Sequence, residues 1–287
     1  MEKHTAFEKY NPIVNFSFFV VAILFGMIFM HPYFLLISFA LAVIFFVSVS
    51  GRAAIKLFLS MLPVALLVAL LNPLLNTRGE HVLFTYFDRN YTLESVVYGA
   101  VFAVILLVIS FWFASYSKLI TSDKFMYIFG PLAPSLSLVL TMVLRFVPNF
   151  STKAKQIVNA RQSIGKGDKR DAPAVIGALS TWGFENGITT ADSMKSRGYG
   201  SGRRTSFSIF KFTVRDAMLL LVMILLSVII IYCSVKGGMT ATFVPTIEFE
   251  NNIYTFVGLG AYFSLLILPT IINLKEVLLW QILRSKI

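Results

Sequence analysis

Apolar runs of membrane-spanning length, separated by short polar segments, make up most of the sequence. A helix needs roughly 20 residues to cross about 30 Å of hydrocarbon, and six runs come close to that length or exceed it. The connection at His31-Pro32 is so short that the first two runs should form an antiparallel hairpin. The predicted spans are 13–30, 33–50, 57–75, 93–116, 216–232 and 253–272.

A further apolar run, 131–147, is predicted not to cross the membrane. It begins with Pro131, includes Pro134 and contains Arg145. If it crossed, the strongly basic segment that follows would lie outside the cell, against the tendency of Lys and Arg to stay in the cytoplasm. We therefore expect an interfacial or cytoplasmic helix here, and six transmembrane helices with both termini in the cytoplasm.

The basic segment 149–205 is the one long polar region of the chain, and its pattern predicts two helices. In the first, apolar residues recur at the three-and-four spacing of one helical face. Arg161 falls in this row, one turn before Gly165 can end the helix, so a permanent cation takes an apolar position. The other members of the row are Phe150, Ala154, Ile157, Val158 and Ile164.

The second helix ends in a similar way. Its apolar row leads to Arg197, and Gly198 follows as the expected C-cap. The helix dipole stabilises a cation in the last turn of a helix by about 0.3–1 kcal/mol. This effect alone can account for a single arginine at such a position, with no partner protein involved. Two such arginines favour contacts with acidic grooves of a partner, because guanidinium keeps its charge and donates in several directions. The row comprises Ile176, Leu179, Gly183, Gly187, Ala191 and Met194.

Composition indicates an all-α polytopic membrane protein. Hydrophobic residues fill 57% of 287 positions, charged residues fill 14%, and the mean hydropathy is +0.77. A soluble domain has no means of burying so much apolar surface. The net charge of +11 comes from cations at the ends of apolar runs, as in orientation signals, so no nucleic-acid partner is expected. The single cysteine, Cys233, excludes an intramolecular disulfide.

No pattern of a catalytic, metal or cofactor site is found. His4, His31 and His81 fall in different topological zones, and the Gly and Lys residues at 165–169 lack the spacing of a phosphate-binding loop. The interiors of the six predicted spans contain no Asp, Glu, Lys, Arg or His. Carriers driven by protons or sodium commonly need such groups at mid-membrane, so the energy for any transport should enter from another protein.

Two motifs in the basic segment resemble a known family. Ala160-Arg161-Gln162 and Ser196-Arg197-Gly198 are similar to the two Ala-Arg-Gly motifs of the transmembrane T component of energy-coupling-factor (ECF) transporters, which are vitamin and metal importers related to ABC transporters. The Leu-Arg-Phe-Val-Pro segment ending at Pro148 is similar to the family's Leu-Arg-Phe-Ile-Pro. Gln162 replaces the first glycine of the family pattern and Ser196 the second alanine, while both arginines are kept.

The resemblance implies a non-catalytic energy-coupling subunit with no cofactor, in a prokaryotic cell membrane. Its partners would be two ABC ATPases, a small membrane-embedded substrate-binding S component and membrane lipids, and its cargo a vitamin or a metal ion. The predicted spans and the basic segment divide the chain into three parts. These are an N-terminal membrane domain of four helices at 1–117, a cytoplasmic or interfacial coupling domain with two arginine-tipped helices at 118–212, and C-terminal membrane helices with an amphipathic tail at 213–287.

The residues that the resemblance assigns to this task lie in the coupling domain. Those expected at the ATPase-coupling site are Ala160, Arg161, Gln162, Ser196, Arg197 and Gly198, and those expected to support the coupling helices are Arg145, Pro148, Met194 and Tyr199.

Two other functions stay open. A polytopic membrane enzyme, such as a lipid-group transferase, would place its chemistry on Asp168, Asp171 and Asp192, but these lack a D-x-x-D type cluster that could hold a metal. Their other roles would be solvation and capping, since Thr189 and Asp192 have capping-box spacing, although both also fit the interior of a long helix. A stand-alone ABC permease is the remaining alternative.

Overall fold

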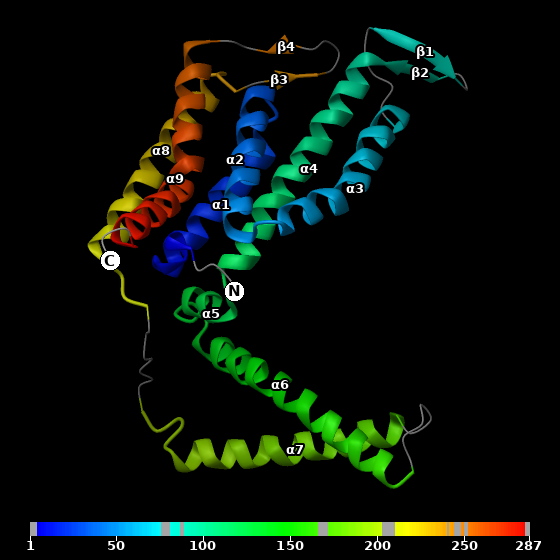
Figure 1. The fold of residues 1–287 in the computed structure, drawn as a ribbon, viewed down its shortest axis with the longest axis vertical. Coiled ribbons are helices and arrows are strands. Elements are labelled where there is room, and N and C mark those ends of the chain that lie inside the picture. The colour runs from blue at the N-terminus through cyan, green and yellow to red at the C-terminus, as the bar shows by residue number, and fades with distance from the viewer. Residues whose placement is uncertain are drawn as a thin grey trace. The chain divides into compact units, whose positions relative to one another are not determined.

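The computed structural model describes residues 5–75, 81–86, 89–165, 172–202, 210–239, 241–243, 248–249 and 252–284. The chain forms two compact units, Met1–Lys124 with Phe210–Ile287, and Phe125–Ile209. The first unit is a helix bundle with two short β-hairpins at one end (Figure 1). Its elements are η1 (Ala6–Lys9), α1 (Pro12–Ile28), α2 (Pro32–Ser50), α3 (Ala53–Leu75), β1 (Val82–Tyr86), β2 (Arg89–Thr92), α4 (Leu93–Leu119), α8 (Val214–Val235), β3 (Ala241–Thr242), β4 (Glu248–Phe249) and α9 (Ile253–Arg284).

The second unit is built from helices. Its elements are α6 (Pro134–Ser163), α7 (Ala172–Ser196) and the end of α5 (Ser122–Phe129), a short helix that begins in the first unit.

The core of the first unit is aromatic. Phe7, Phe18, Phe45 and Trp112 are all fully buried. Their rings meet in pairs, with centroids 5.5 Å apart for Phe7 and Phe18, 5.6 Å for Phe18 and Trp112, and 6.0 Å for Phe45 and Trp112. The indole Nε1 of Trp112 donates to Ser38 Oγ at 3.2 Å, so its polar atom is satisfied. This cluster joins η1, α1, α2 and α4 into one body.

Polar side chains fix the starts of two helices at the end of the bundle away from the hairpins. Asn11 caps α1 by accepting from the Ile13 N–H at 3.0 Å. Thr213 and Asp216 form a capping box at the start of α8. Asp216 Oδ1 also accepts from the Asn11 N–H at 3.1 Å. The starts of α1 and α8 therefore lie side by side.

Six helices of the described chain are long and apolar enough to cross a membrane: α2, α3, α4, α6, α8 and α9. The prediction of an all-α polytopic membrane protein is confirmed. The 17-residue α1 is shorter, yet it packs within the same bundle. Among the six, α6 has the lowest mean hydropathy, 1.2, and none of its residues is buried. The interfacial position of 131–147, which forms part of α6, stays a prediction.

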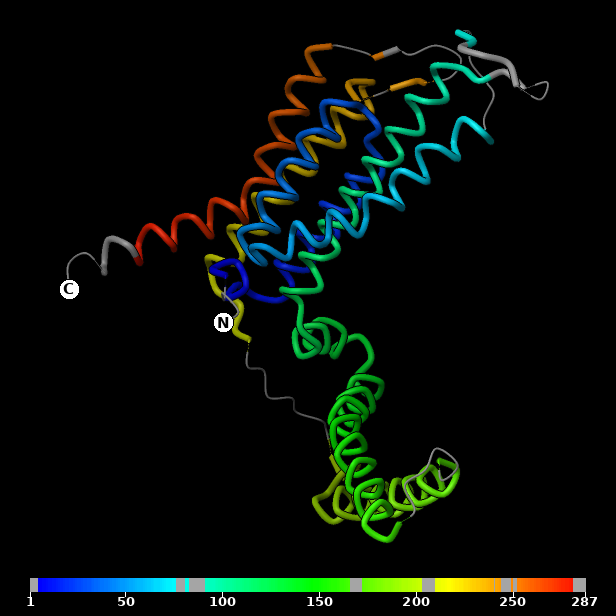
Figure 2. The backbone as a smooth tube through the Cα atoms, turned by 45° about the vertical axis from the view of Figure 1, so that its right-hand side comes forward, coloured from blue at the N-terminus to red at the C-terminus, as the bar shows by residue number. Residues whose placement is uncertain are grey.

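The last predicted span and the tail after it belong to one helix. The pattern favours a membrane span at 253–272 and an amphipathic tail after it, and α9 runs without a break from Ile253 to Arg284. Pro269 lies inside α9, and the helix changes direction so that its C-terminal part turns away from the bundle (Figure 2). Proline bends a helix because it removes one backbone hydrogen bond and its ring displaces the preceding turn. The end of the membrane span at 272 and the interfacial position of the tail stay predictions.

Candidate functional site

The first arginine motif forms the last turn of α6. Gly165, with φ of 76°, ends the helix in the left-handed region, and its N–H donates to the Gln162 carbonyl at 3.0 Å. The predicted stop at this glycine is confirmed. Arg161 is half-buried, while Ala160 and Gln162 on either side of it are exposed. The cation therefore does lie on the partly covered face of α6, as the sequence pattern indicated.

The second arginine motif ends α7 with a complete Schellman motif. The Gly198 N–H donates to the Lys195 carbonyl at 3.0 Å, and the Tyr199 N–H donates to the Met194 carbonyl at 2.9 Å. Gly198 has φ of 82°, a conformation that glycine adopts at no steric cost. The predicted end of the second helix is confirmed. Arg197 lies directly before this glycine, so the backbone that carries it has a defined geometry.

The two arginines do not occupy equivalent positions. Arg161 precedes its helix-ending glycine by four residues and is half-buried, whereas Arg197 immediately precedes Gly198 and is exposed. Arg161 is therefore partly covered within its unit, and Arg197 is exposed at the end of α7.

An aromatic contact fixes how α6 and α7 cross. The ring of Phe150 in α6 meets the Trp182 ring of α7 edge-on, with centroids 5.1 Å apart. Lys153 Nζ lies 5.8 Å from the centre of the same indole, within cation–π range. Gly183 leaves the space that Phe150 occupies, because a Cβ there would lie 2.7 Å from Phe150 Cζ. The sequence pattern did not identify this contact, since it depends on which helix packs on which.

The crossing holds the two motifs apart. The C-terminal end of α6 and the C-terminal end of α7 lie at opposite ends of the helix pair (Figure 1). With 25 residues, α7 is about 37 Å long, which sets the scale of the separation. The structure therefore does not bring Arg161 and Arg197 together into one site, and each can meet a different surface.

The apolar rows predicted for these helices are only partly right. In α6, Ile164 is 70% exposed and lies beyond the helix end, although the other predicted apolar members are half-buried. In α7, Ile176, Gly187 and Ala191 are exposed. The half-buried face instead consists of Val175, Leu179, Trp182, Gly183, Asn186, Thr190 and Met194.

Local hydrogen bonding explains how a polar residue can take a place on this half-buried face. The Thr190 hydroxyl donates to the Asn186 carbonyl at 2.6 Å, so its polar group is satisfied within the helix. A threonine at this position therefore costs little stability. Because it is polar, the predicted row of apolar residues did not include it. The predicted row likewise lacks Trp182, although this residue makes the main contact with α6.

The helix pair leaves much apolar surface uncovered within its own unit. Neither α6 nor α7 has a buried residue, and the supporting residues Arg145 and Pro148 are exposed, as is the motif residue Ser196. Met194 is half-buried and Tyr199 is 46% exposed. Exposed apolar side chains of this size commonly mark contact surfaces. Those at least half exposed are Leu136, Val139, Val147, Ile176, Phe184 and Ile188.

The carboxylates of the enzyme alternative gain no support as a cluster. Asp168 and Asp171 lie outside the described residues, and Asp192 is exposed on α7. Within the described parts of the chain, His, Cys, Asp and Glu form no group of three or more that could hold a metal ion. The capping box suggested for Thr189 and Asp192 is wrong, because α7 runs through both and the Thr189 hydroxyl donates to the Glu185 carbonyl at 2.9 Å.

Fold and site define a polytopic α-helical membrane protein with a separate pair of crossed helices, each ending in an arginine motif. No family model matches the chain. The transmembrane protein EcfT of the energy-coupling factor transporter from Lactococcus lactis subsp. cremoris is 28% identical over 182 residues, which are 56% of this chain and 68% of the relative. EcfT of Lactobacillus helveticus is 27% identical over 168 residues, 52% of this chain and 60% of that protein.

A third match is the uncharacterized MG181 homolog of Mycoplasma pneumoniae, 29% identical over 111 residues, 36% of this chain and 26% of that protein. The two EcfT matches confirm the resemblance carried by the arginine motifs. The chain is a multi-pass membrane transport protein related to the T components of ECF transporters.

Proposed function

We propose that this chain is the energy-coupling T subunit of an ECF-type importer. It would pass the ATP-driven motion of two ABC ATPases to a membrane-embedded S component that binds a vitamin or a metal ion. The observation that carries the proposal is the crossed α6–α7 pair, with one arginine motif at each C-terminal end. Both helix ends are closed by a left-handed glycine.

The geometry suits transmission of force. A helix can pass motion along its length only if it is stiff and attached at a fixed point, since a flexible segment absorbs displacement. The Phe150–Trp182 contact supplies the fixed point, and the two glycine-closed ends keep the arginines from fraying away from their helices. Each arginine would dock in an acidic groove of one ATPase, where guanidinium can donate several hydrogen bonds at once.

The orientation in the membrane is part of the proposal. Both termini and the α6–α7 pair would lie in the cytoplasm, where ATP is available. The hairpins at β1–β2 and β3–β4 would then lie outside. The exposed apolar side chains of α6 and α7 would contact the S component, and substrate selectivity would belong to that subunit.

Charge reversal tests the docking role. The double variant Arg161→Glu/Arg197→Glu should insert into the membrane normally but lose co-purification with the ATPases in mild detergent. The matched control is Lys155→Glu/Lys195→Glu, which makes the same change in charge at exposed positions of the same two helices. The control should keep the ATPases. Full ATPase binding by the arginine double variant would contradict the proposal.

A further inference from the structure

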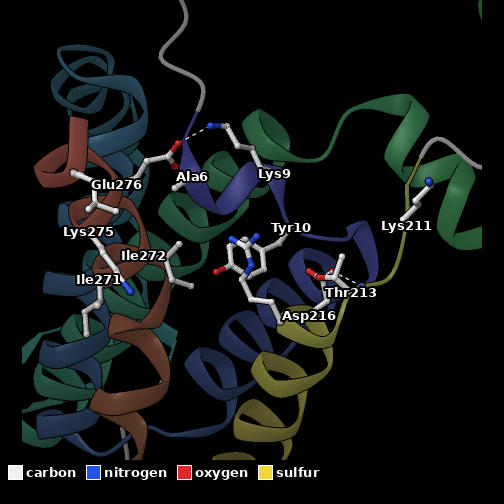
Figure 3. Close-up of a pocket in the computed structure, with 12 residues that line it drawn as sticks. Ala6, Lys9, Tyr10, Lys211, Thr213, Asp216, Ile271, Ile272, Lys275 and Glu276 are labelled. Carbon is white, nitrogen blue, oxygen red and sulfur yellow. Dashed lines mark hydrogen bonds and ion pairs between the residues drawn. The ribbon is translucent and has the colours of Figure 1, made fainter. Parts of the chain in front are cut away.

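We propose that a basic cavity in the first unit binds the headgroup of an anionic phospholipid. The cavity has a volume of about 730 Å³ and lies where η1, the first turn of α8 and the C-terminal half of α9 meet (Figure 3). All of its lining residues belong to the first unit. The site shares no residue with the two arginine motifs, and the inference does not depend on the proposed ATPase docking.

The lining of the cavity carries more positive than negative charges, which favours the binding of an anion. Its lining includes four cations, Lys9, Lys211, Arg215 and Lys275, against the two carboxylates of Asp216 and Glu276. Figure 3 shows Lys9 beside Glu276, Lys275 on the same helix as Glu276, and Lys211 on the segment that leads to Thr213 and Asp216.

Both carboxylates already have partners. Asp216 accepts from the Thr213 N–H at 2.9 Å, from the Thr213 hydroxyl at 2.6 Å and from the Asn11 N–H at 3.1 Å. Glu276 is paired with Lys9. Lys211 and Lys275 form no ion pair with any described residue, so their charges are left to attract a ligand.

One cation is held in place by an aromatic ring. The guanidinium carbon of Arg215 lies 5.4 Å from the centre of the Tyr10 ring, within cation–π range. The interaction limits the rotamers of Arg215 before any ligand arrives, which lowers the entropic cost of binding. The guanidinium donors can still reach a phosphate, because a cation–π contact uses the face of the group and leaves its edge available.

The cavity lies at the level where a lipid headgroup would be. From Ile253 to Ile272, a residue of the cavity wall, α9 has 20 residues and is about 30 Å long, which matches the roughly 30 Å of hydrocarbon. The part of α9 after this point, with Lys275 and Glu276, turns away from the bundle (Figure 2) and therefore lies at the level of the headgroups. Lys211 and Arg215 flank the start of α8, where the other span enters the membrane.

An apolar wall favours a lipid over a soluble anion. Ile271, Ile272 and Leu279 line the same cavity, and Ile271 and Leu279 are about half exposed. A phospholipid would place its phosphate among the cations and its acyl chains against these side chains. Basic pockets between membrane helices on the cytoplasmic side are known to take anionic lipid headgroups, and the positive-inside tendency puts this end of the bundle on that side.

Lipid titration of the purified full chain, followed by native mass spectrometry in detergent, tests the site. Wild type should bind phosphatidylglycerol more tightly than phosphatidylcholine. The variant Lys211→Gln/Arg215→Gln/Lys275→Gln should weaken phosphatidylglycerol binding by about tenfold or more, because each surface cation contributes to attraction of an anionic lipid. All three side chains are exposed, so folding should persist, and a melting curve verifies this. Lys275→Gln alone should still weaken binding measurably.

The matched control removes the same charge elsewhere in the first unit. Arg52→Gln/Lys56→Gln/Lys118→Gln changes three exposed cations that do not line the cavity. It should alter phosphatidylglycerol affinity by less than about threefold. Equal losses in the two triple variants, or equal affinity of wild type for the two lipids, would overturn the proposal.

Glycerol phosphate separates a lipid site from a site for a soluble phosphate. It carries the phosphate without acyl chains, so it should bind much more weakly than phosphatidylglycerol, and Leu279→Ser should weaken only the lipid. If glycerol phosphate bound as tightly as phosphatidylglycerol and with the same dependence on the three cations, the cavity would be a site for soluble anions and the lipid assignment would fail.

Discussion

The ring of Phe150 occupies the space that a side chain at Gly183 would need. A Cβ at Gly183 would lie 2.7 Å from Phe150 Cζ and 3.0 Å from Phe150 Cε1, closer than carbon atoms normally approach. Trp182, the neighbour of Gly183, packs edge-on against the same ring. The crossing of α6 and α7 is therefore defined by one aromatic residue against one glycine.

We predict that Gly183→Leu separates the two coupling helices. Its side chain cannot share the space with Phe150, so overpacking should cost about 1–3 kcal/mol. Differential scanning fluorimetry of the full chain should show a lower melting temperature, and transport by the assembled importer should fall. Adding Phe150→Ala to Gly183→Leu should recover part of the loss, because it removes the atoms that clash.

The control for this prediction lies one turn further along α7. A Cβ at Gly187 would have no neighbouring atom within 4 Å, so Gly187→Leu should leave the crossing intact. It should be neutral or slightly stabilising, because leucine favours a helix over glycine by about 0.5–1 kcal/mol. If Gly183→Leu and Gly187→Leu behaved alike, the contact with Phe150 would not be what fixes the helix pair.

We predict that Gly198→Ala frays the end of α7. With φ of 82°, this position is unfavourable for a residue that has a Cβ, and the substitution should cost about 1 kcal/mol or more. Loss of the Schellman hydrogen bonds would free Arg197, so affinity for the ATPases should fall although the arginine is retained. Binding assays with purified ATPases measure the effect. Gly202→Ala, where φ is not positive and the space is open, should have no effect.

Local patterns predict the helix ends and most spans correctly. A glycine after an apolar row marks the end of a helix wherever the chain packs, so Gly165 and Gly198 can be identified from their neighbours alone. The long apolar runs likewise reflect the membrane as solvent and not the details of packing. The same reasoning does not show that α9 continues as one helix beyond the predicted span, because Pro269 bends α9 without breaking it.

Two kinds of feature could not be predicted from the sequence: which of two similar spacings forms a capping box, and which residues of different helices come into contact. The capping box at Thr213 and Asp216 is present, while the one suggested by the same spacing at Thr189 and Asp192 is not. Spacing alone does not tell a helix start from a helix interior. The contact between Phe150 and Gly183 requires knowing how two helices cross, and the sequence of each helix does not contain that information.

The role of Lys124 also could not be predicted from the sequence. Its position after an apolar run indicates an orientation signal, but it is 5% exposed and donates to the Leu119 carbonyl at 2.9 Å and the Glu8 carbonyl at 3.0 Å. Burial lowers the pKa of Lys124, and the charge of Glu8 opposes that shift. Its ammonium group therefore ties the end of α4 to the 3₁₀ turn η1.

We predict that Lys124→Met destabilises the first unit by about 1–3 kcal/mol, because two buried carbonyls lose a charged donor. Thermal unfolding in detergent measures the change. Lys118→Met is the control, since Lys118 is exposed and its substitution removes the same charge from the same region. Equal melting temperatures for the two variants would show that the buried ammonium does not hold these elements together.

The last prediction concerns pH and rests on His31. This residue is fully buried between α1 and α2, with ring centroids 5.2 Å from Tyr33, 5.7 Å from Phe34 and 5.7 Å from Phe249. Neither ring nitrogen has a hydrogen-bond partner among the described residues. Burial lowers the pKa of His31 below its ordinary value of 6.5. The unfolded chain therefore takes up a proton near pH 6.5, while the folded chain resists it until the pH is lower.

It follows that stability should fall as the pH drops below 6.5. His31→Phe fits among the same aromatic rings, lacks the titrating group and leaves no unsatisfied nitrogen. It should therefore be more stable than wild type at neutral pH by about 1 kcal/mol, and the difference should widen at acidic pH. Melting temperatures of both proteins at pH 7.5 and pH 5.5 measure this. A wild-type curve that parallels the His31→Phe curve at both pH values would mean that His31 takes up a proton in the folded protein as readily as in the unfolded chain, and it would contradict the prediction.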